Sequence, residues 1–405
     1  MKRLIIVISI LTLILALAMV GASLMSREKE LKDSQITISN LEFDLNSCKI
    51  IYNDLLNNKQ TINKQLEEKT KLAEELSLQI ESLQNELLQA EENNTLQQEE
   101  ILNLQTQIES LQEQLKTANA EIEDLKNQSN VIDDRILSYM AIITGSDYEG
   151  DFVIPEGVTT IRDNAFKNMT NIKGRLILPS SLTYMGDFAF SHTGITSVEN
   201  INVLNTNCFE FCENLKNVYF SSKFTNMHLG AFVGCPNIEN IIVDEANTKF
   251  TSKNINGLLL KTNGCLVLGG TKTVFTEEIK KISNCAFSGR SLQVIEIPSS
   301  VKIIDSNAFL NSSLETIILN SGLEQLGAYC FSGCKNLSSI YIYSSVTSIP
   351  TNVFKNCSSS LVIYCETNVQ PSGWVSNWNY YDTSHALTTY YGYTYEQYLE
   401  AIATE

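Results

Sequence analysis

The sequence is poor in the residues that build most catalytic and metal sites. Of its 405 residues only three are histidines, His192, His228 and His385, and they show no zinc-ligand spacing. No Ser/His/Asp, Cys/His or paired-carboxylate constellation stands out, and no glycine-rich loop resembles a phosphate cradle. We therefore expect no catalytic residue, no metal and no cofactor, and we rank an exported enzyme far behind a non-enzymatic protein.

Positive charge is also scarce. The formal net charge of -17 divides into +2 for residues 1–25, -12 for residues 26–140 and -7 for the remainder. No segment is basic enough to follow a phosphate backbone, so the composition argues against nucleic-acid binding. It argues equally against a direct hold on an anionic membrane surface beyond the first three residues.

Charge is absent from the stretch that follows Met1-Lys2-Arg3. Residues 4–25 are mostly apolar, and as a helix they would span roughly 33 Å, enough for a bilayer core. We predict a signal anchor and transmembrane helix over residues 1–25, with the N-terminus cytoplasmic and the remainder extracellular. The alternative is a cleaved signal peptide ending at Val20-Gly21-Ala22, which would make the protein secreted.

Proline and glycine are missing between Leu31 and Tyr139, where a heptad repeat runs without a break. Apolar residues occupy 26 of its 32 a and d positions. A strict 3.5-residue period keeps its seam buried only by supercoiling around a partner. Residues 26–140 are therefore predicted to form a long coiled-coil stalk, a rod of roughly 160 Å.

The seam residues suggest how many chains the stalk contains. From Ile101 onward Ile dominates position a and Leu dominates position d, which favours a parallel homodimer, and Asn94 at an a position points the same way. A local weakening of the seam around Asn94 is the alternative. Cys48 at a d position would face its twin and could form an interchain disulfide, or it is simply a small apolar seam residue.

The remaining chain repeats one pattern: a short alternating strand, an aliphatic pair three residues apart, then a small residue and Phe. A period of 22 to 24 residues predicts a solenoid, because no unit can bury its apolar side alone. The marker phenylalanines are Phe166, Phe190, Phe209, Phe232, Phe287, Phe309, Phe331 and Phe354.

Strand triplets recur twelve residues before the markers, and stacking them predicts a parallel sheet along the solenoid. Alternation points the middle residue of each triplet outward. These residues are almost all apolar, which suits the pleat of a sheet but also marks a candidate partner-binding stripe. The stripe comprises Ile177, Tyr219, Ile242, Val274, Ile318, Tyr341 and Val362, together with Val153 and the one charged member, Glu296.

One gap between markers is 55 residues long and holds an insertion at about residues 244–272. Two apolar runs flank Thr262-Asn263-Gly264, which predicts a β-hairpin with an Asn-Gly turn. Insertions of this kind lie on one face of a solenoid, either as part of a binding surface or as a cover for the core.

Nine of the ten cysteines lie in the repeat half, and several recur once per repeat. The repeat itself explains their spacing, so we predict buried thiols in an apolar slot rather than a zinc site. Disulfides, for instance between Cys357 and Cys365, stay open.

The pattern IEIPSSVKIIDSNAF, the endings FSGCKN and FVGCPN, and the inserted hairpin resemble the BspA-type leucine-rich repeats over roughly residues 150–380. The segment IYCETNVQPSGWVSNWN is similar to the C-terminal cap of such proteins. The resemblance implies a non-enzymatic surface module that attaches to extracellular or cell-surface macromolecules. The third repeat, with its weak strand, and the helical stalk depart from the family pattern.

The predicted architecture is thus a transmembrane helix (1–25), a coiled-coil stalk (26–140), a β-rich leucine-rich-repeat solenoid (141–365) and a C-terminal cap and tail (366–405). The leading functional hypothesis is a membrane-anchored, adhesin-like protein whose head binds a macromolecule, most simply a protein. Two paired heads would gain avidity. A structural or scaffolding envelope protein is the alternative, in which stalk and solenoid mediate assembly.

Overall fold

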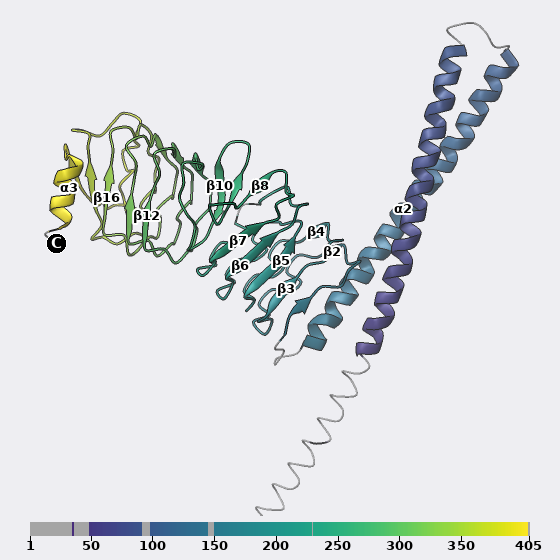
Figure 1. Ribbon diagram of the computed structural model, residues 1–405, viewed down its shortest axis with the longest axis horizontal. Coiled ribbons are helices and arrows are strands. Elements are labelled where there is room, and N and C mark those ends of the chain that lie inside the picture. Colours follow the sequence, from purple (N-terminus) through teal and green to yellow (C-terminus); the bar gives the residue numbers. More distant parts are fainter. Residues whose placement is uncertain (1–34, 36–47, 91–97, 145–149, 229, 404–405) are drawn as a thin grey trace, which may run out of the picture. The chain divides into compact units, whose positions relative to one another are not determined.

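A computed structural model describes residue 35 and residues 48–90, 98–144, 150–228 and 230–403. The chain divides into two units, Met1–Asn57 and Asn58–Glu405. In the first unit residue 35 and residues 48–57 are described, and they are helical. The second unit contains the rest of a helical region, all the strands and the C-terminus (Figure 1).

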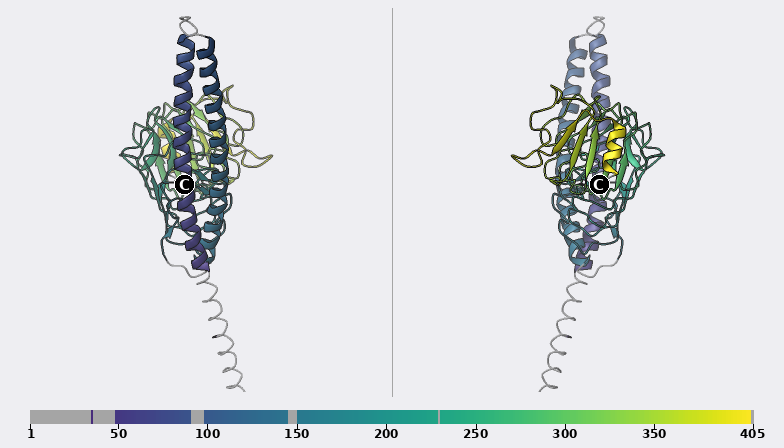
Figure 2. Two further views of the ribbon diagram at one scale, coloured as in Figure 1. Left: turned by 90° about the vertical axis from the view of Figure 1, so that its right-hand side faces the viewer. Right: turned by 90° about the vertical axis from the view of Figure 1, so that its left-hand side faces the viewer.

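Two long helices begin the second unit, one over residues 58–90 and the other, α2, over Gln98–Thr144. Their contacts show that they are antiparallel: residues early in the first helix contact residues late in α2. Lys59 contacts Asp133, Lys69 contacts Glu121, and Ala73 clusters with Ala118. Figure 2 shows the two helices side by side.

The prediction of one uninterrupted rod is therefore wrong for the described residues 59–90 and 98–133. The heptad seam exists, but its two halves pack against each other within one chain. The polar seam positions explain the choice, since in a parallel dimer Lys59 and Lys69 would each face an identical cation. In the hairpin they face Asp133 and Glu121 instead.

A buried ion pair joins the two helices, and its carboxylate also binds the first repeat. The Lys59 ammonium lies 2.6 Å from Asp133, and both side chains are almost fully buried, at 1% and 0% exposed. The other Asp133 oxygen accepts hydrogen bonds from the backbone N–H of Thr159, at 3.1 Å, and of Thr160, at 3.2 Å. Because these two N–H groups lie at the start of β2 (Thr160–Ile161) in the first repeat, the helical hairpin caps the N-terminal end of the solenoid.

The repeats wind into a solenoid whose first face is a row of short parallel strands (Figure 1). Neighbouring strands pair in parallel within three sheets, β1-β3-β5-β6-β7, β12-β14 and β16-β17-β18, as in Val218 opposite Ile241. The predicted strand at Thr273–Phe275 is not formed, because insertion residues take the place beside β7. The strands are β1 (Phe152–Val153), β3 (Arg175–Ile177), β5 (Ser197–Ile201), β6 (Asn217–Phe220), β7 (Asn240–Val243), β12 (Val294–Glu296), β14 (Thr316–Ile318), β16 (Ser339–Ile342), β17 (Val362–Cys365) and β18 (Thr388–Tyr391).

The aliphatic pairs form a second row: β2 (Thr160–Ile161), β4 (Tyr184–Met185), β11 (Lys281–Ile282), β13 (Ile303–Ile304) and β15 (Gln325–Leu326). The predicted hairpin is confirmed as β9 (Gly257–Leu260) antiparallel to β10 (Cys265–Gly269), and β8 (Phe250–Thr251) adds a third strand. Its loop contains residues 261–264, with Gly264 at φ +66. Since β10 pairs with β11 and buries Leu266 and Leu268, the insertion extends the solenoid and covers its core.

The marker phenylalanines form the spine of the core. All eight are buried, and neighbouring rings stack at centroid distances of 4.9 to 5.8 Å on either side of the insertion. Phe275, just after the insertion, stacks on Phe287 at 5.6 Å and continues the column. Deleting one such ring would cost about 3–5 kcal/mol, because neither neighbour can close the gap without leaving its own repeat.

The turn around each marker follows a conformational rule that the sequence alone did not reveal. Residues two before and two after the marker have positive φ in every repeat, so the N–H of the marker and its flanking residues can donate to carbonyls of the next repeat. The sixteen residues are Asn164, Asn168, Phe188, His192, Asn207, Phe211, Gly230, Gly234, Cys285, Gly289, Asn307, Asn311, Tyr329, Gly333, Asn352 and Asn356.

The C-terminal end is closed by a cap and a helix. Trp374 donates its indole N–H to the Val346 carbonyl at 2.8 Å, and Trp378 packs edge-on against Phe354. The last element, α3 (Tyr395–Ile402), begins with a capping box in which the side chains of Thr394 and Gln397 each bond the other's backbone. This helix docks on the sheet, where Tyr398 packs against Tyr341 and Tyr364.

Candidate functional site

The N-terminal part of the predicted stripe is uncovered. Val153 and Ile242 are 49% and 44% exposed, and Ile177 and Tyr219 are half-buried on the same outward face of β1, β3, β6 and β7. Register pairs them directly, Val153 opposite Ile177 and Tyr219 opposite Ile242. The four residues form two adjacent pairs on one face, and β5 runs between the pairs with Glu199 opposite Ile177. We call these four residues the open stripe.

Charged residues border the open stripe. Arg175 on β3 bonds both Asp151 and Glu199, which raises the pKa of the guanidinium and lowers that of Asp151. On the far side the Lys272 ammonium lies 2.5 Å from Glu239, and this bond lowers the pKa of that carboxyl. Charged residues thus lie beside the apolar pairs and, at Glu199, between them, and protein interfaces combine apolar and charged residues in this way.

The middle of the stripe is broken. Val274 is 52% exposed but lies outside any strand, where its N–H donates to the Ile255 carbonyl at 2.7 Å. Glu296 is exposed on β12, and Ile318 on β14 is half-buried. The continuous apolar stripe that the alternation predicted is therefore interrupted at the insertion.

The C-terminal part of the stripe is covered by α3, and here the prediction of an exposed surface is wrong. Tyr341 is only 3% exposed, and Val362 packs half-buried against the same cluster. The rings of Tyr341 and Tyr364 lie 5.4 and 5.3 Å from Tyr398 of α3. We call this set, completed by Tyr343, Tyr393, Tyr395, Ala401 and Ile402, the tyrosine cluster.

Hydrogen bonds fix the helix on the sheet. The Tyr341 hydroxyl donates to the Tyr393 carbonyl at 2.8 Å, and the hydroxyls of Ser339 and Tyr398 lie 3.2 Å apart. Burial raises the pKa of Tyr341 to about 12, with smaller contributions from nearby negative charges such as Glu366. A neutral Tyr341 hydroxyl is thus part of how the helix is held.

The cysteines form a ladder with a role beyond filling space. Three residues after the marker, Cys212, Cys235, Cys334 and Cys357 each donate S–H to the carbonyl of the preceding marker, at 3.0 to 3.2 Å. Burial raises the pKa of Cys330, Cys334 and Cys357, so these thiols stay protonated. The prediction of buried thiols is confirmed, and every described cysteine is a free thiol in this structure.

Arg290 occupies the ladder position where the insertion interrupts the repeat. It is buried, and its guanidinium donates to the carbonyls of Phe232, Cys235 and Gly269, each at 2.9 Å. Burial lowers its pKa to about 10, so it remains charged at neutral pH. A longer donor than cysteine is needed here, because Arg290 reaches repeats on both sides of the insertion; sequence reasoning missed this residue.

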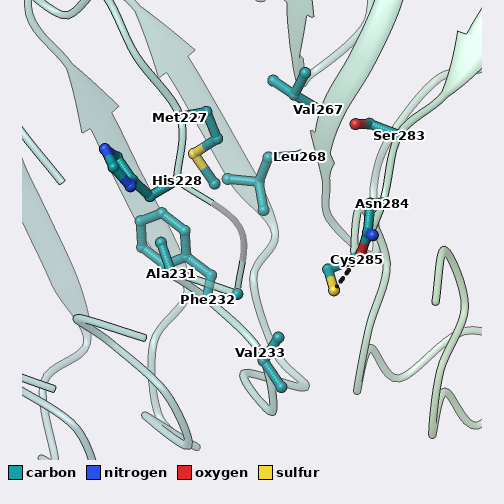
Figure 3. Close-up of a pocket in the computed structure, with 11 residues that line it drawn as sticks. Met227, His228, Ala231, Phe232, Val233, Val267, Leu268, Ser283, Asn284 and Cys285 are labelled. Carbon is teal, nitrogen blue, oxygen red and sulfur yellow. Dashed lines mark hydrogen bonds between the residues drawn. The ribbon is translucent and has the colours of Figure 1, made fainter. Parts of the chain in front are cut away.

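A cavity of about 40 Å³ lies at the same junction, between residues 227–233, β10 and the turn at Cys285 (Figure 3). The Cys285 thiol lies 2.8 Å from the Asn284 side-chain oxygen. This volume accommodates water but is far below the roughly 300 Å³ at which small-molecule pockets begin. Within the described ranges no cluster of His, Cys, Asp or Glu is arranged to hold a metal.

The remaining predicted sites concern the stalk and the anchor. Asn94 and residues 1–25 lie outside the described residues. Cys48 is half-buried in a helical segment of the first unit. In the portion of the chain that the structure covers, no helix combines the length and apolarity needed to cross a bilayer.

The sequence also matches a known protein family. The BspA type leucine rich repeat region matches residues 148–258 and 269–373 in six copies, more than half of the chain. The two matched ranges leave out residues 259–268, which contain the hairpin loop and most of β10. No curated protein matches the sequence.

Several solved structures are similar. A leucine rich cell surface protein from Faecalibacterium prausnitzii shares 20% identity over 62% of this chain and 80% of its own, with a TM-score of 0.38. A leucine-rich repeat protein from Eubacterium ventriosum shares 18% identity over 56% and 69%, with a TM-score of 0.43. The pneumococcal vaccine antigen PcpA shares 16% over 64% and 87%, with a TM-score of 0.33.

Proposed function

The chain belongs to the BspA-type leucine-rich repeat family, and from this premise we propose that it is a non-enzymatic, adhesin-like cell-surface protein. Its repeat head recognises an extracellular protein or another surface macromolecule. The observation that carries the proposal is the open stripe, an uncovered apolar sheet face whose C-terminal continuation the chain covers with its own helix. An apolar surface of this kind that is exposed to water is typical of an interaction site.

The contrast between covered and uncovered sheet supports a binding role over a packing role. At Tyr341 and Tyr364, the chain supplies α3 to bury the outward residues. Where they are Val153, Ile177, Tyr219 and Ile242, no described element covers them. Rigid aromatic and aliphatic residues on a preformed sheet cost little entropy when they bind, which suits recognition by this face.

The proposal retains a signal anchor at residues 1–25 that holds the chain at the cell membrane with its C-terminus outside. It also retains pairing of two copies, for avidity, with one change of location. The seam from Lys59 to Asp133 is used within the chain, so pairing would fall to the preceding heptads, which include Cys48. A helical hairpin also projects about half as far as an unbroken rod of the same residues.

The test is binding by the whole chain, because cutting at residue 140 would expose the end of the solenoid that Asp133 and Thr159 close. We would measure saturable binding to immobilised extracellular-matrix proteins and to cells, for the native chain and for Ile242→Asp. The matched control is Val369→Asp, which also places an acid on an exposed apolar position, but in the cap and away from the stripe.

Loss of binding at least tenfold larger in Ile242→Asp than in Val369→Asp is the expected result, since a charge in an apolar contact must be desolvated. Equal binding by both variants would remove the open stripe from the proposal. Self-association of the native chain with no binding to any surface would favour the scaffolding function instead.

A further inference from the structure

The positive-φ positions that flank the marker phenylalanines indicate a second candidate site, away from the sheet face. Seven of the sixteen are Asn and four are Gly, the residues that tolerate this conformation best. Five are not, and three of these five, Phe188, His192 and Phe211, lie in two consecutive repeats. We call these three the aromatic ridge.

Two of the three ridge residues are exposed despite their backbone strain, and Phe188 is half-buried. Phe211 is 44% exposed and His192 is exposed, with their ring centroids 5.0 Å apart. The chain also makes room for the Phe211 ring, because a Cβ on Gly234 in the next repeat would lie only 2.4 Å from it. Strained residues that stay exposed are typical of functional positions, since folding alone would favour Asn or Gly there.

The ridge itself shows which chemistry its rings accept. The Lys167 ammonium lies 4.5 Å from the centroid of the Phe188 ring. Outside the ridge, one aromatic side chain among the described residues is at a positive-φ position, Tyr329. It also has a lysine across its face, with the Lys355 ammonium 5.9 Å from the ring centroid. Both contacts are cation–π interactions, in which the negative face of the ring attracts an ammonium.

Carboxylates complete a surface suited to cations. Asp187 precedes Phe188, Glu210 precedes Phe211, and Glu213 follows two residues later. The whole chain carries a formal net charge of -17, which attracts a basic partner during the encounter. Aromatic faces beside carboxylates match the apolar stem and charged head of lysine and arginine side chains.

We propose that the aromatic ridge binds a basic segment of a partner protein through its lysine and arginine side chains. This site lies in the marker turns and is separate from the open stripe. A ligand cation would take the place that Lys167 holds over Phe188 and would add contacts to His192 and Phe211.

The experiment uses the whole chain and a short fluorescein-labelled peptide of alternating Arg and Gly, with fluorescence anisotropy at a pH where His is neutral. The test variant is Phe188→Asn/His192→Asn/Phe211→Asn, which keeps every charge and installs the residue that most repeats use. The control is Tyr329→Asn, the same kind of exchange outside the ridge. Thermal unfolding is measured on all three proteins.

We expect the triple variant to bind the peptide about tenfold more weakly or worse, with three cation–π contacts removed, and to melt at the same or a higher temperature. The control should keep native affinity. Unchanged affinity in the triple variant, or equal weakening in the control, would overturn the proposal by showing that net charge alone holds the peptide.

A lower melting temperature in the triple variant would also overturn it, because the rings would then serve packing. A neutral oligosaccharide that binds the native chain but not the triple variant, without competing with the peptide, would assign the ridge to another ligand class. Neither result bears on Ile242, so this inference and the proposed function can fail separately.

Discussion

The two ends of the solenoid are closed by different devices. At the N-terminal end a helical hairpin covers the open edge of the first repeat and holds it through a buried ion pair, while the sheet face beside it stays uncovered. At the C-terminal end two tryptophans close the core, and α3 folds over the sheet face. The comparison shows that one repeat pattern can produce an available surface or a buried one, depending on whether a later segment of the chain folds back over it.

The largest expected effect comes from breaking the N-terminal closure. Asp133→Ala leaves the Lys59 ammonium buried without its carboxylate, and we expect a loss of about 3–5 kcal/mol in the free energy of unfolding. Denaturant titration measures it. The double variant Lys59→Met/Asp133→Leu should recover the part of the loss that comes from the unpaired charge, while the Thr159 and Thr160 N–H groups still lack their acceptor. A loss below about 1 kcal/mol in the single variant would mean that water reaches the pair.

Breaking the C-terminal closure should release α3 without unfolding the solenoid. Tyr398→Ala removes the ring that contacts Tyr341 and Tyr364, and we expect α3 to lose about 1–3 kcal/mol of docking free energy while the solenoid stays folded. Hydrogen exchange at the α3 amides reports this opening. Leu399→Ala, on the exposed side of the same helix, is the control. Protection that stays native in Tyr398→Ala would show that the tyrosine cluster does not hold the helix.

Alkaline pH should weaken the docking of α3 at the C-terminal end through ionisation of Tyr341. The pKa of Tyr341 is raised to about 12 in the folded chain, against about 10 in an unfolded one. Its contribution to docking is therefore fully present below about pH 10 and is lost as the pH rises toward 12, because the unfolded or undocked state ionises first. Near-ultraviolet circular dichroism of the tyrosines should follow this loss.

Tyr341→Phe provides the comparison for that measurement. Lacking the hydroxyl, it should dock more weakly at neutral pH, having lost the bond to the Tyr393 carbonyl, yet depend less on pH in this range. If both proteins lose their signal over the same pH range and to the same extent, Tyr341 is not the group that couples pH to docking.

The smallest effect on stability is expected from a cross-link that distinguishes the hairpin from a parallel dimer. Ala73→Cys/Ala118→Cys, in a Cys48→Ser background, places thiols where the two helices meet within one chain. Oxidation should give a cross-linked monomer on a non-reducing gel, with little change in the melting temperature. Covalent dimers as the main product would show that two copies pair in parallel along this seam.

Much of the fold could be predicted because it is local and periodic. The marker phenylalanines, the strand triplets, the inserted hairpin and the buried cysteines all follow from spacing, and the structure contains them. The prediction failed at Thr273–Phe275, where an apolar triplet was present but insertion residues occupied the neighbouring position in the row. Asn and Gly recur at the positive-φ positions, but the pattern was not recognised in the sequence because Phe188, His192 and Phe211 do not fit it.

The candidate site was predicted in part. Alternation placed Val153, Ile177, Tyr219 and Ile242 on the outward face, and they are on it. The same argument placed Tyr341 there and was wrong about its exposure, because alternation identifies a face but not what covers it. Nothing in the sequence indicated the role of Arg290, since that role depends on carbonyls of residues 21 to 58 positions away in the sequence.

The sequence by itself determined the repeat, its hydrophobic spine and the existence of a helical seam, since each is set by a short period that stacking neighbours can satisfy. Only the tertiary structure decided which seam halves meet, which end of the sheet stays open and which turns carry strained rings. These outcomes depend on residues far apart in the chain, such as Lys59 with Asp133 and Tyr341 with Tyr398. A periodic pattern specifies the face that must be buried, and the free energy of competing contacts selects what buries it.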